Sequence, residues 1–331
     1  MSAIKVGIIG GSGMGDALGA KAEGQRHEID TPFGKPSDAI VEMNWEGLPV
    51  YFLSRHGAGH TLGPTQVPFR ANIFALKMLG VTHLIASGAV GSLRDEYKPR
   101  DLVIADQIID KTSKRAGSFF EHAAVHVEFA EPFCPVLRQI LIEQASPELG
   151  RGAGGEQARS GQAGNGEPSA PSFTVHQRGC YVCMEGPAFS TRAESLMHRL
   201  WGGDLIGMTA MPEAKLAREA EMAYALVALV TDYDCWRKTP PKGDAPSASP
   251  EQSRGADASK LLEEIIANLS AASDNAVALI RRAIGHMAAH RDALAPSPAH
   301  EALKLAIWSD KSRLPADEVE RLAPLWIKYF R

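Results

Sequence analysis

The chain has 331 residues, of which 44% are hydrophobic, so it is long enough to bury a sizeable core. Its formal net charge of −4 argues against sequence-independent binding to nucleic acid. Four cysteines are too few for an extracellular disulfide framework and indicate a reducing compartment, the cytoplasm. The N-terminus lacks the apolar region of a signal peptide, and no apolar run reaches the roughly 20 residues of a membrane span. We therefore expect neither nucleic acid nor a membrane as a partner.

Short apolar runs bounded by turn residues predict buried strands at residues 5–9, 49–53, 83–87, 102–104, 205–208 and 226–231. Apolar residues at helical spacing predict helices at residues 71–79, 193–200, 261–287 and 317–329. Strands that alternate with helices are typical of α/β proteins. We expect a single domain with a central mixed β-sheet flanked by helices, and a helical C-terminal tail.

Two segments interrupt this pattern because they are rich in Gly, Ala, Ser and Pro. Residues 146–172 and 239–259 cannot bury enough surface to offset the entropy lost when they become ordered. We expect 146–172 to be a flexible insertion in a domain of residues 1–238, and 239–259 to be a linker or loop. Residues 260–331 should form a helical part that packs on the same domain.

The glycine-rich stretch after the first predicted strand is similar to a dinucleotide-binding fingerprint but fails its test. Counted from Gly11, the third glycine of G-x-G-x-x-G should stand where the chain has Asp16, and no clear amphipathic helix follows. A dinucleotide-dependent oxidoreductase is therefore disfavoured. Glycines after a strand also let backbone N–H groups converge on an anion, and Ser12 adds a hydroxyl donor. A phosphate cradle and a tight turn without a ligand both remain open at this point.

Further candidate anion ligands follow other predicted strands. Arg55 offers a planar fork of N–H donors that suits phosphate, and His56 beside it donates or accepts. Small and hydroxyl residues follow two more strands, at residues 87–92 and at Met208 and Thr209. Ligands of open α/β sheets gather at the carboxyl ends of strands, which favours a binding site over a surface Arg–His pair and plain turns.

Two carboxylates end the predicted strand at 226–231. Asp232 and Asp234 stand two residues apart, so they point to the same side of an extended chain. Close like charges raise the pKa of one group, which suits a proton donor, although a solvated loop has the same pattern. Phe189, next to a Gly-Pro turn, has a ring that could stack on a flat base or pack in the core.

Cys180 and Cys183 form a lone CxxC pair. A zinc site needs two further ligands at suitable spacing, and none is obvious in the sequence. We therefore expect these cysteines to be packing residues and expect no bound metal.

Seven strings of residues resemble those of one enzyme family: GIIGGSG (7–13), DTPFGKPSD (30–38), SRHGAGHT (54–61), GSLRDE (91–96), AEPFCP (130–135), EGPAFSTRAES (185–195) and TDYDCW (231–236). The chain is similar to the methylthioadenosine phosphorylase branch of the trimeric purine nucleoside phosphorylase family. The resemblance implies phosphorolysis of S-methyl-5'-thioadenosine to adenine and 5-methylthioribose 1-phosphate, in purine and methionine salvage. It also implies that inorganic phosphate is a co-substrate and that no cofactor is required.

The resemblance implies a role for each matching residue. Phosphate would be bound by Ser12, Arg55, His56, Gly88, Ala89 and Thr209. The nucleoside would be bound by Met208, Asp232, Tyr233, Asp234, Phe189, Ser190 and His126. Asp232 would be the catalytic residue, because it would protonate purine N7 while bound phosphate captures C1'. His126 would reach the substrate of a neighbouring subunit in a homotrimer.

One position departs from the family, and two alternatives remain. The family usually has threonine where this chain has Gly88, so one hydroxyl donor to phosphate is missing. A phosphorylase for 6-oxopurine nucleosides or methylthioinosine is one alternative, but it would need a donor to O6, typically asparagine, where this chain has Asp232. A non-catalytic nucleoside-binding protein is the other, and Gly88 is the only hint of it.

Overall fold

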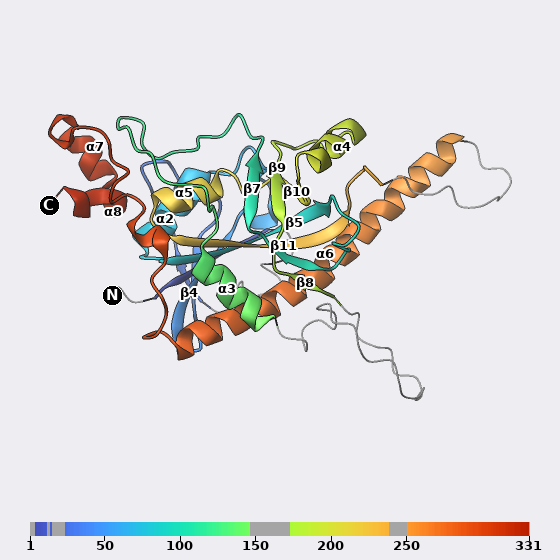
Figure 1. The fold of residues 1–331 in the computed structure, drawn as a ribbon, viewed down its shortest axis with the longest axis horizontal. Coiled ribbons are helices and arrows are strands. Elements are labelled where there is room, and N and C mark those ends of the chain that lie inside the picture. The colour runs from blue at the N-terminus through green and yellow to red at the C-terminus, as the bar shows by residue number, and fades with distance from the viewer. Residues whose placement is uncertain (1–3, 12–13, 15–23, 146–172, 238–249, 331) are drawn as a thin grey trace.

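The computed structural model describes residues 4–11, 14, 24–145, 173–237 and 250–330 (Figure 1). The insertion expected at 146–172 and residues 239–249 of the expected linker lie outside these ranges. Among the helices in the described part of the chain, none combines the length and apolar character required to cross a membrane.

The described residues form one mixed sheet of 11 strands. Its central strands are β1 (Val6–Gly10), β4 (Leu48–Ser54), β5 (His83–Ser92) and β11 (Ala223–Tyr233). The others are β2 (Gln25–His27), β3 (Ile40–Trp45), β6 (Leu102–Ile104), β7 (Gln107–Asp110), β8 (Val175–His176), β9 (Cys180–Cys183) and β10 (Leu205–Gly207). β1 pairs in parallel with β4 and β5, and β11 pairs in parallel with β5 along its length.

β5 connects two halves of the sheet. Its first residues pair with β1, whereas Gly91 and Ser92 pair with the antiparallel β10. β10 in turn pairs in parallel with β9, which pairs in parallel with β7. The far end of β5 therefore lies beside both β10 and β11.

The described residues include the α-helices α2 (Phe69–Met78), α3 (Pro135–Gln144), α4 (Arg192–Leu200), α5 (Glu213–Glu219), α6 (Pro250–Ala289), α7 (Ala316–Arg321) and α8 (Ala323–Trp326). α6 crosses one face of the sheet, with α3 packed beside it (Figure 1). α2 and α5 belong to the hydrophobic cluster of the opposite face. Both faces of the central strands are thus covered, which explains their continuous apolar sequences.

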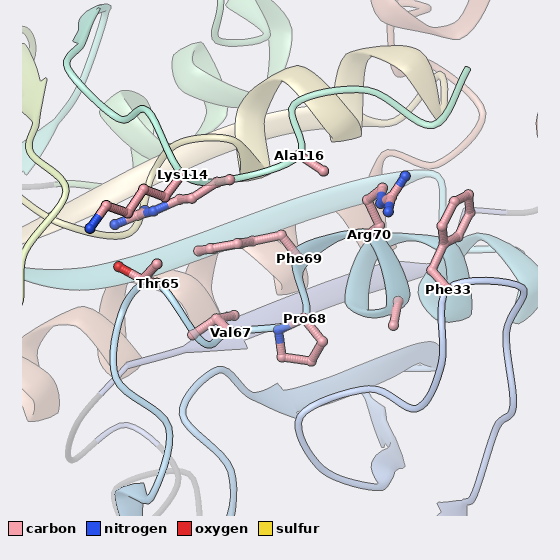
Figure 2. Close-up of a pocket in the computed structure, with 10 residues that line it drawn as sticks. Phe33, Thr65, Val67, Pro68, Phe69, Arg70, Lys114 and Ala116 are labelled. Carbon is pink, nitrogen blue, oxygen red and sulfur yellow. The ribbon is translucent and has the colours of Figure 1, made fainter. Parts of the chain in front are cut away.

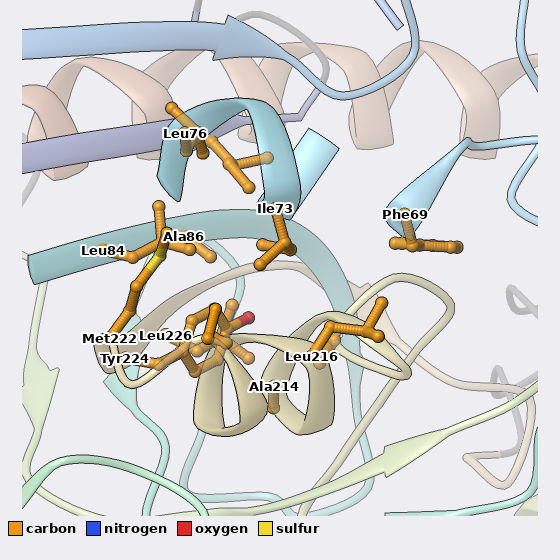
Figure 3. Packing of buried hydrophobic residues seen from close by; sticks show 14 of the residues in the cluster. Phe69, Ile73, Leu76, Leu84, Ala86, Ala214, Leu216, Met222, Tyr224 and Leu226 are labelled. Atoms are coloured by element: carbon orange, nitrogen blue, oxygen red, sulfur yellow. The ribbon is translucent and has the colours of Figure 1, made fainter. Parts of the chain in front are cut away.

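Alternate residues of the central strands point into two hydrophobic clusters. Leu84 and Leu226 join the cluster that contains Ile73 and Leu76 of α2, as Figure 3 shows. Their neighbours Ile85 and Val227 join the cluster beneath α6. Full burial of one such side chain contributes about 1.5–3 kcal/mol relative to leaving it exposed.

The C-terminal segment is anchored to the sheet by one buried carboxylate. Glu221 precedes β11 and accepts hydrogen bonds from the hydroxyl of Tyr329, at 2.5 Å, and from the backbone N–H of Leu303, at 3.1 Å. Lys328 Nζ lies 2.6 Å from its other oxygen. Trp326 is fully buried in the same cluster as α2. The tail therefore packs on the domain that contains the sheet.

The expected fold class is confirmed, but β2, β3, β7, β8, β9, α3 and α5 were not expected, and the bounds of other elements differ. Three of these differences bear on the site or on the C-terminal segment. β5 continues to Ser92 because β11 and β10 pair with its second half, so Gly88 and Ala89 lie inside a strand and not after one. α6 begins at Pro250, so residues 250–259 are helical and not a loop. The helix expected at 317–329 is divided into α7, α8 and a 3-10 turn, because Pro324 has no N–H to continue the helical bonding.

Candidate active site

Several predicted phosphate residues meet where β1, β4 and β10 end beside β5. The carbonyl of Gly10 accepts a hydrogen bond from the backbone N–H of Arg55 at 3.0 Å. A Cβ atom added to Gly88 would lie 3.2 Å from Thr209 Oγ1 and 4.0 Å from Arg55 Nη1. A Cβ atom added to Gly11 would lie 3.4 Å from the same Nη1 atom. Arg55, Gly88 and Thr209 come from separate motifs, and tertiary packing brings them together.

The Arg55 guanidinium is buried and oriented by Glu213 of α5. Its Nε and Nη2 atoms donate to the two oxygens of Glu213 at 2.9 and 3.0 Å, and the Tyr224 hydroxyl donates to the same carboxylate at 2.9 Å. Nη1 donates to the Ser87 carbonyl at 2.7 Å. Burial disfavours the cation, but the Glu213 carboxylate outweighs burial and holds the pKa of Arg55 above its ordinary value. Nη1, which has a second hydrogen, is the guanidinium atom nearest the two glycines.

His56 is held as a neutral imidazole. Its Nδ1 lies 2.8 Å from the carbonyl of Leu62, and because a carbonyl only accepts, Nδ1 carries the hydrogen. Burial, followed by the charge of Arg55, lowers the pKa of His56 to about 4. Nε2 is then an unprotonated acceptor near neutral pH. Such an atom matches the hydroxyl group of monohydrogen phosphate, which can donate to it.

Asp232 and Asp234 lie together over β5 at the end of β11. A Cβ atom added to Gly91 would lie 3.5 Å from Asp232 Oδ2 and 3.3 Å from Asp234 Cβ. Asp232 Oδ1 accepts from the Thr231 hydroxyl at 2.7 Å. Asp234 Oδ2 is buried and has no hydrogen-bond partner in the described structure. The pair can therefore accept hydrogen bonds from an amino group.

The environment of Asp232 favours its protonated form. Burial raises the pKa of Asp232, the Thr231 hydroxyl opposes this shift, and the neighbouring Asp234 adds to it. A carboxyl group with a raised pKa is a better proton donor near neutral pH than an ordinary aspartate. This geometry agrees with the role expected of Asp232, which stays a prediction.

Met208 and Ala89 lie close to these groups. Met208 directly precedes Thr209, and its carbonyl accepts a hydrogen bond from Arg115 Nη1 at 2.6 Å. Ala89 is exposed on β5 beside the buried Gly88. Ser12 lies outside the described residues, so its place beside phosphate stays a prediction.

Other predicted nucleoside residues are less enclosed. Phe189 is 82% exposed, so it is neither a core residue nor covered by the rest of the chain. Ser190 is partly buried, and its carbonyl accepts from Cys235 Sγ at 3.2 Å. The hydroxyl of Tyr233 points to the Asp95 carbonyl at 3.4 Å. These positions leave the roles of Phe189, Ser190 and Tyr233 as predictions.

His126 is exposed and contacts the C-terminal segment. Its backbone N–H donates to the Ala306 carbonyl at 2.9 Å, and its ring lies 4.6 Å from that of Trp308. Trp308 is itself 71% exposed. Within the described part of the chain, none of the contacts found for His126 involves Arg55, Thr209 or Asp232.

Sequence reasoning missed Glu213, Glu185 and Arg115. Glu213 lies in α5, and an acidic residue in the otherwise apolar stretch 210–214 was the available signal of a buried partner. Glu185 was part of a recognised motif, but the motif did not indicate which residue it binds. Arg115 follows a polar stretch that has no apolar periodicity, so no sequence signal indicated that it is buried.

A cavity of about 200 Å³ lies near this site but does not contain the predicted ligands. Figure 2 shows it between the segment 65–71 and the segment 114–116. Phe33 and Arg70 complete one side. Its lining includes none of the predicted phosphate or nucleoside residues.

Comparison with known proteins identifies the family. The model of the phosphorylase superfamily matches residues 5–285, which include most of α6. The chain belongs to this superfamily. A superfamily member from Thermosynechococcus vestitus, named S-methyl-5'-thioadenosine phosphorylase, is 44% identical over 326 residues, which is 98% of this chain and 99% of the relative. The protein of that name from Chloroflexus aurantiacus is 44% identical over 332 residues, with both chains fully covered.

Solved structures of the superfamily have the same fold. A methylthioadenosine phosphorylase from an antarctic soil metagenomic library has a TM-score of 0.78 and 41% identity, over 98% of this chain and 99% of the other. Methylthioadenosine phosphorylase from Schistosoma mansoni, in complex with tubercidin, has a TM-score of 0.72 and 33% identity, over 94% and 100%.

Proposed function

We propose that this enzyme is a pentosyltransferase that cleaves S-methyl-5'-thioadenosine with inorganic phosphate. The products are adenine and 5-methylthioribose 1-phosphate, so the reaction serves purine and methionine salvage. One observation carries the proposal: Asp232 and Asp234, at the end of β11, lie against Gly91 of β5, and Gly88 beside Arg55 belongs to the same strand β5. Near full-length relatives named for this activity support it.

Phosphate would bind between the Gly11 and Gly88 backbones. Arg55 Nη1 and the Thr209 hydroxyl would donate to its oxygens, with Ser12 and the backbone at Ala89 as further ligands. The neutral His56 would accept from the phosphate hydroxyl. The buried Glu213 keeps Arg55 in place, so little reorganisation is needed when phosphate enters.

The purine would bind against the end of β11. The carboxylate oxygens of Asp232 and Asp234 would accept from the 6-amino group, and protonated Asp232 would donate its proton to N7. Phe189, Ser190 and Tyr233 would form the walls around the base. Met208 would contact the ribose through its backbone.

The reaction then breaks one bond and forms one. The C1'–N9 bond lengthens, its electron pair leaves with the purine, and the ribose gains oxocarbenium character. N7 takes the proton from Asp232, which gives neutral adenine. A phosphate oxygen attacks C1' from the opposite face, where binding has already placed it. These steps use only side chains, backbone groups and the two substrates.

The 6-oxopurine alternative is less well matched to this site. A 6-oxo base has an acceptor where adenine has a donor, and it would face the acceptor oxygens of Asp232 and Asp234. An unmatched buried polar pair costs about 1–3 kcal/mol, and more when charged. We therefore favour the 6-amino substrate.

We further propose a cytoplasmic homotrimer in which His126 extends into a neighbouring subunit's site. The exposed rings of His126 and Trp308 lie side by side and are available for contact with another chain. This arrangement would cover the 5' substituent of the bound nucleoside.

The direct test is release of adenine from S-methyl-5'-thioadenosine by the purified enzyme, followed by absorbance, with and without phosphate. We expect release only when phosphate is present and little reaction with methylthioinosine. The Asp232→Ala variant is the matched control for contaminating activity. Hydrolysis without phosphate, or a preference for the oxo substrate, would contradict the proposal.

A further inference from the structure

Arg115 has a buried, extensively hydrogen-bonded side chain next to the candidate active site, and no catalytic role accounts for it. Its side chain is 1% exposed, and it lies on the segment that follows β7. Nη1 donates to the carbonyls of Met208 and Met211, both at 2.6 Å. Nη2 donates to the Glu185 carbonyl at 2.6 Å. Nε donates to Glu185 Oε1 at 3.0 Å.

These bonds join two segments that reach the substrate from different strands. Met208 follows β10 and precedes Thr209, which belongs to the phosphate side. Glu185 follows β9 and begins the stretch that reaches Phe189 and Ser190, on the base side. One guanidinium therefore sets the spacing between the phosphate and base sides of the site.

The two segments are also in direct contact. A Cβ atom added to Gly186 would lie 2.6 Å from the Met208 sulfur, so the chain after β9 approaches Met208 as closely as glycine allows. Gly186 has a φ of 72°, which a residue with a side chain rarely adopts. A change in the Arg115 contacts would therefore move both segments, because neither has room to shift alone.

Glu185 fixes Arg115 from the other side. Its Oε2 accepts from the backbone N–H groups of Ser113 and Lys114 at 2.6 and 3.1 Å, and its Oε1 accepts from the Thr65 hydroxyl at 3.0 Å. Burial favours the neutral acid, but these hydrogen bonds and Arg115 outweigh it and lower the pKa of Glu185 to about 2. The carboxylate is therefore ionised at neutral pH and holds the Arg115 segment against the β9 end.

We propose that Arg115 is a positioning residue for phosphorolysis, acting through Met208 and Glu185 without touching either substrate. The inference rests on the proposed function, because it concerns the same two substrates. Each of the three guanidinium nitrogens of Arg115 donates to at least one of four protein acceptors. No nitrogen is therefore reserved for a substrate. Lysine has three donors on a single nitrogen in place of a planar fork, so it cannot reach all four of the acceptors that the three guanidinium nitrogens bind.

The test is the Arg115→Lys variant, which keeps the charge and removes the fork. A displacement of about 1 Å in a positioned site costs on the order of a hundredfold in rate. We expect kcat/KM to fall by about thirtyfold to a hundredfold, with KM raised for phosphate and for the nucleoside alike. Asp232→Asn, in contrast, should change kcat and KM for the nucleoside and leave the KM for phosphate within about twofold.

Two matched variants separate positioning from a general loss of stability. Arg70→Lys changes an arginine that lines the same cavity but pairs with the half-exposed Glu121, and its kinetic constants should stay within about twofold. Glu185→Gln removes the negative charge that pairs with Arg115. The double variant Arg115→Lys, Glu185→Gln should be no worse than the poorer single variant, because the two residues act as one unit. Additive losses in the double variant would overturn the proposal.

The experiments distinguish a failure of the proposed function from a failure of the positioning role of Arg115. Wild-type release of adenine reports on the function, whereas the ratio of variant to wild type reports on Arg115. Binding of inorganic phosphate alone, measured by calorimetry, gives a second readout without turnover, and we expect about tenfold weaker binding in Arg115→Lys. Unchanged phosphate binding and unchanged kcat/KM in a variant with a wild-type circular dichroism spectrum would refute the positioning role.

Discussion

Arg55 and Glu213 form a fully buried, two-point ion pair beneath the glycines of the candidate phosphate site. They are 158 residues apart in sequence and are joined at 2.9 and 3.0 Å. Because Nε and Nη2 donate to Glu213 and Nη1 donates one hydrogen to the Ser87 carbonyl, the orientation of Nη1 beside Gly88 is determined before any ligand arrives.

Loss of the Glu213 charge should destabilise the protein and make its stability depend on phosphate. Breaking a buried pair costs about 3–5 kcal/mol, so we expect Glu213→Gln to lower the free energy of unfolding by at least about 3 kcal/mol. Phosphate supplies a new anion beside Arg55 and should restore more stability to the variant than to wild type. Urea denaturation with phosphate, and with chloride at equal ionic strength, measures both effects. Glu121→Gln, which breaks an exposed pair, should cost no more than about 1 kcal/mol.

Gly91→Ala should disturb the base side more than the phosphate side. Its added Cβ would lie 3.0 Å from Ile206 Cγ2 and 3.3 Å from Asp234 Cβ, closer than relaxed packing allows. Overpacking of this kind costs about 1–3 kcal/mol, so we expect KM for the nucleoside to rise about tenfold. The KM for phosphate should stay within about twofold. Gly117→Ala, whose Cβ would meet only Lys215 Cδ at 3.9 Å, is the control. Equal changes in both KM values would show that Gly91 does not act through the aspartates.

Asp232→Asn should change the preferred base. Asparagine offers a donor toward O6 and cannot transfer a proton to N7, so the variant should lose methylthioadenosine activity and gain activity on methylthioinosine or inosine. From the cost of an unmatched polar pair, we expect the ratio of kcat/KM for amino over oxo substrates to fall by roughly tenfold to several hundredfold. The measurement is this ratio for paired substrates in wild type and variant. A ratio that does not move would show that Asp232 does not select the base.

Acid should destabilise the fold through His56. The pKa of His56 is lowered to about 4, so below its ordinary value of 6.5 the unfolded chain binds a proton that the folded protein does not. Stability from this residue is therefore complete above about pH 6.5 and is lost as the pH falls toward 4. The His56→Asn variant should lose less stability than wild type between pH 7 and pH 5 in urea denaturation. Replacement of the exposed His122 by Asn is the control and should retain the wild-type slope.

His126→Ala should weaken binding of the 5' substituent if the enzyme is a homotrimer with shared sites. We expect KM to rise more for methylthioadenosine than for adenosine, because only the former has the methylthio group that His126 would cover. Analytical ultracentrifugation at micromolar concentration measures the assembly. A fully active monomer would contradict the shared site.

Local sequence determined six of the eleven described strands and much of the candidate chemistry. Residues such as Ile8 and Ile9 predict a buried strand because a parallel strand covered on both faces needs apolar side chains in both directions. The spacing of Asp232 and Asp234 predicts their shared face for an equally local reason, the two-residue repeat of an extended chain.

Tertiary structure decided which groups are partners. The pairing of β5 with β11 and β10 carried that strand past residue 87 and placed Gly91 beneath the aspartates. Glu213 and Arg115 are buried because distant segments supply their hydrogen-bond partners, and no local pattern specifies such partners. A buried charge is stable only when folding brings its partners within bonding distance, so its burial depends on the whole chain and not on its neighbours in sequence.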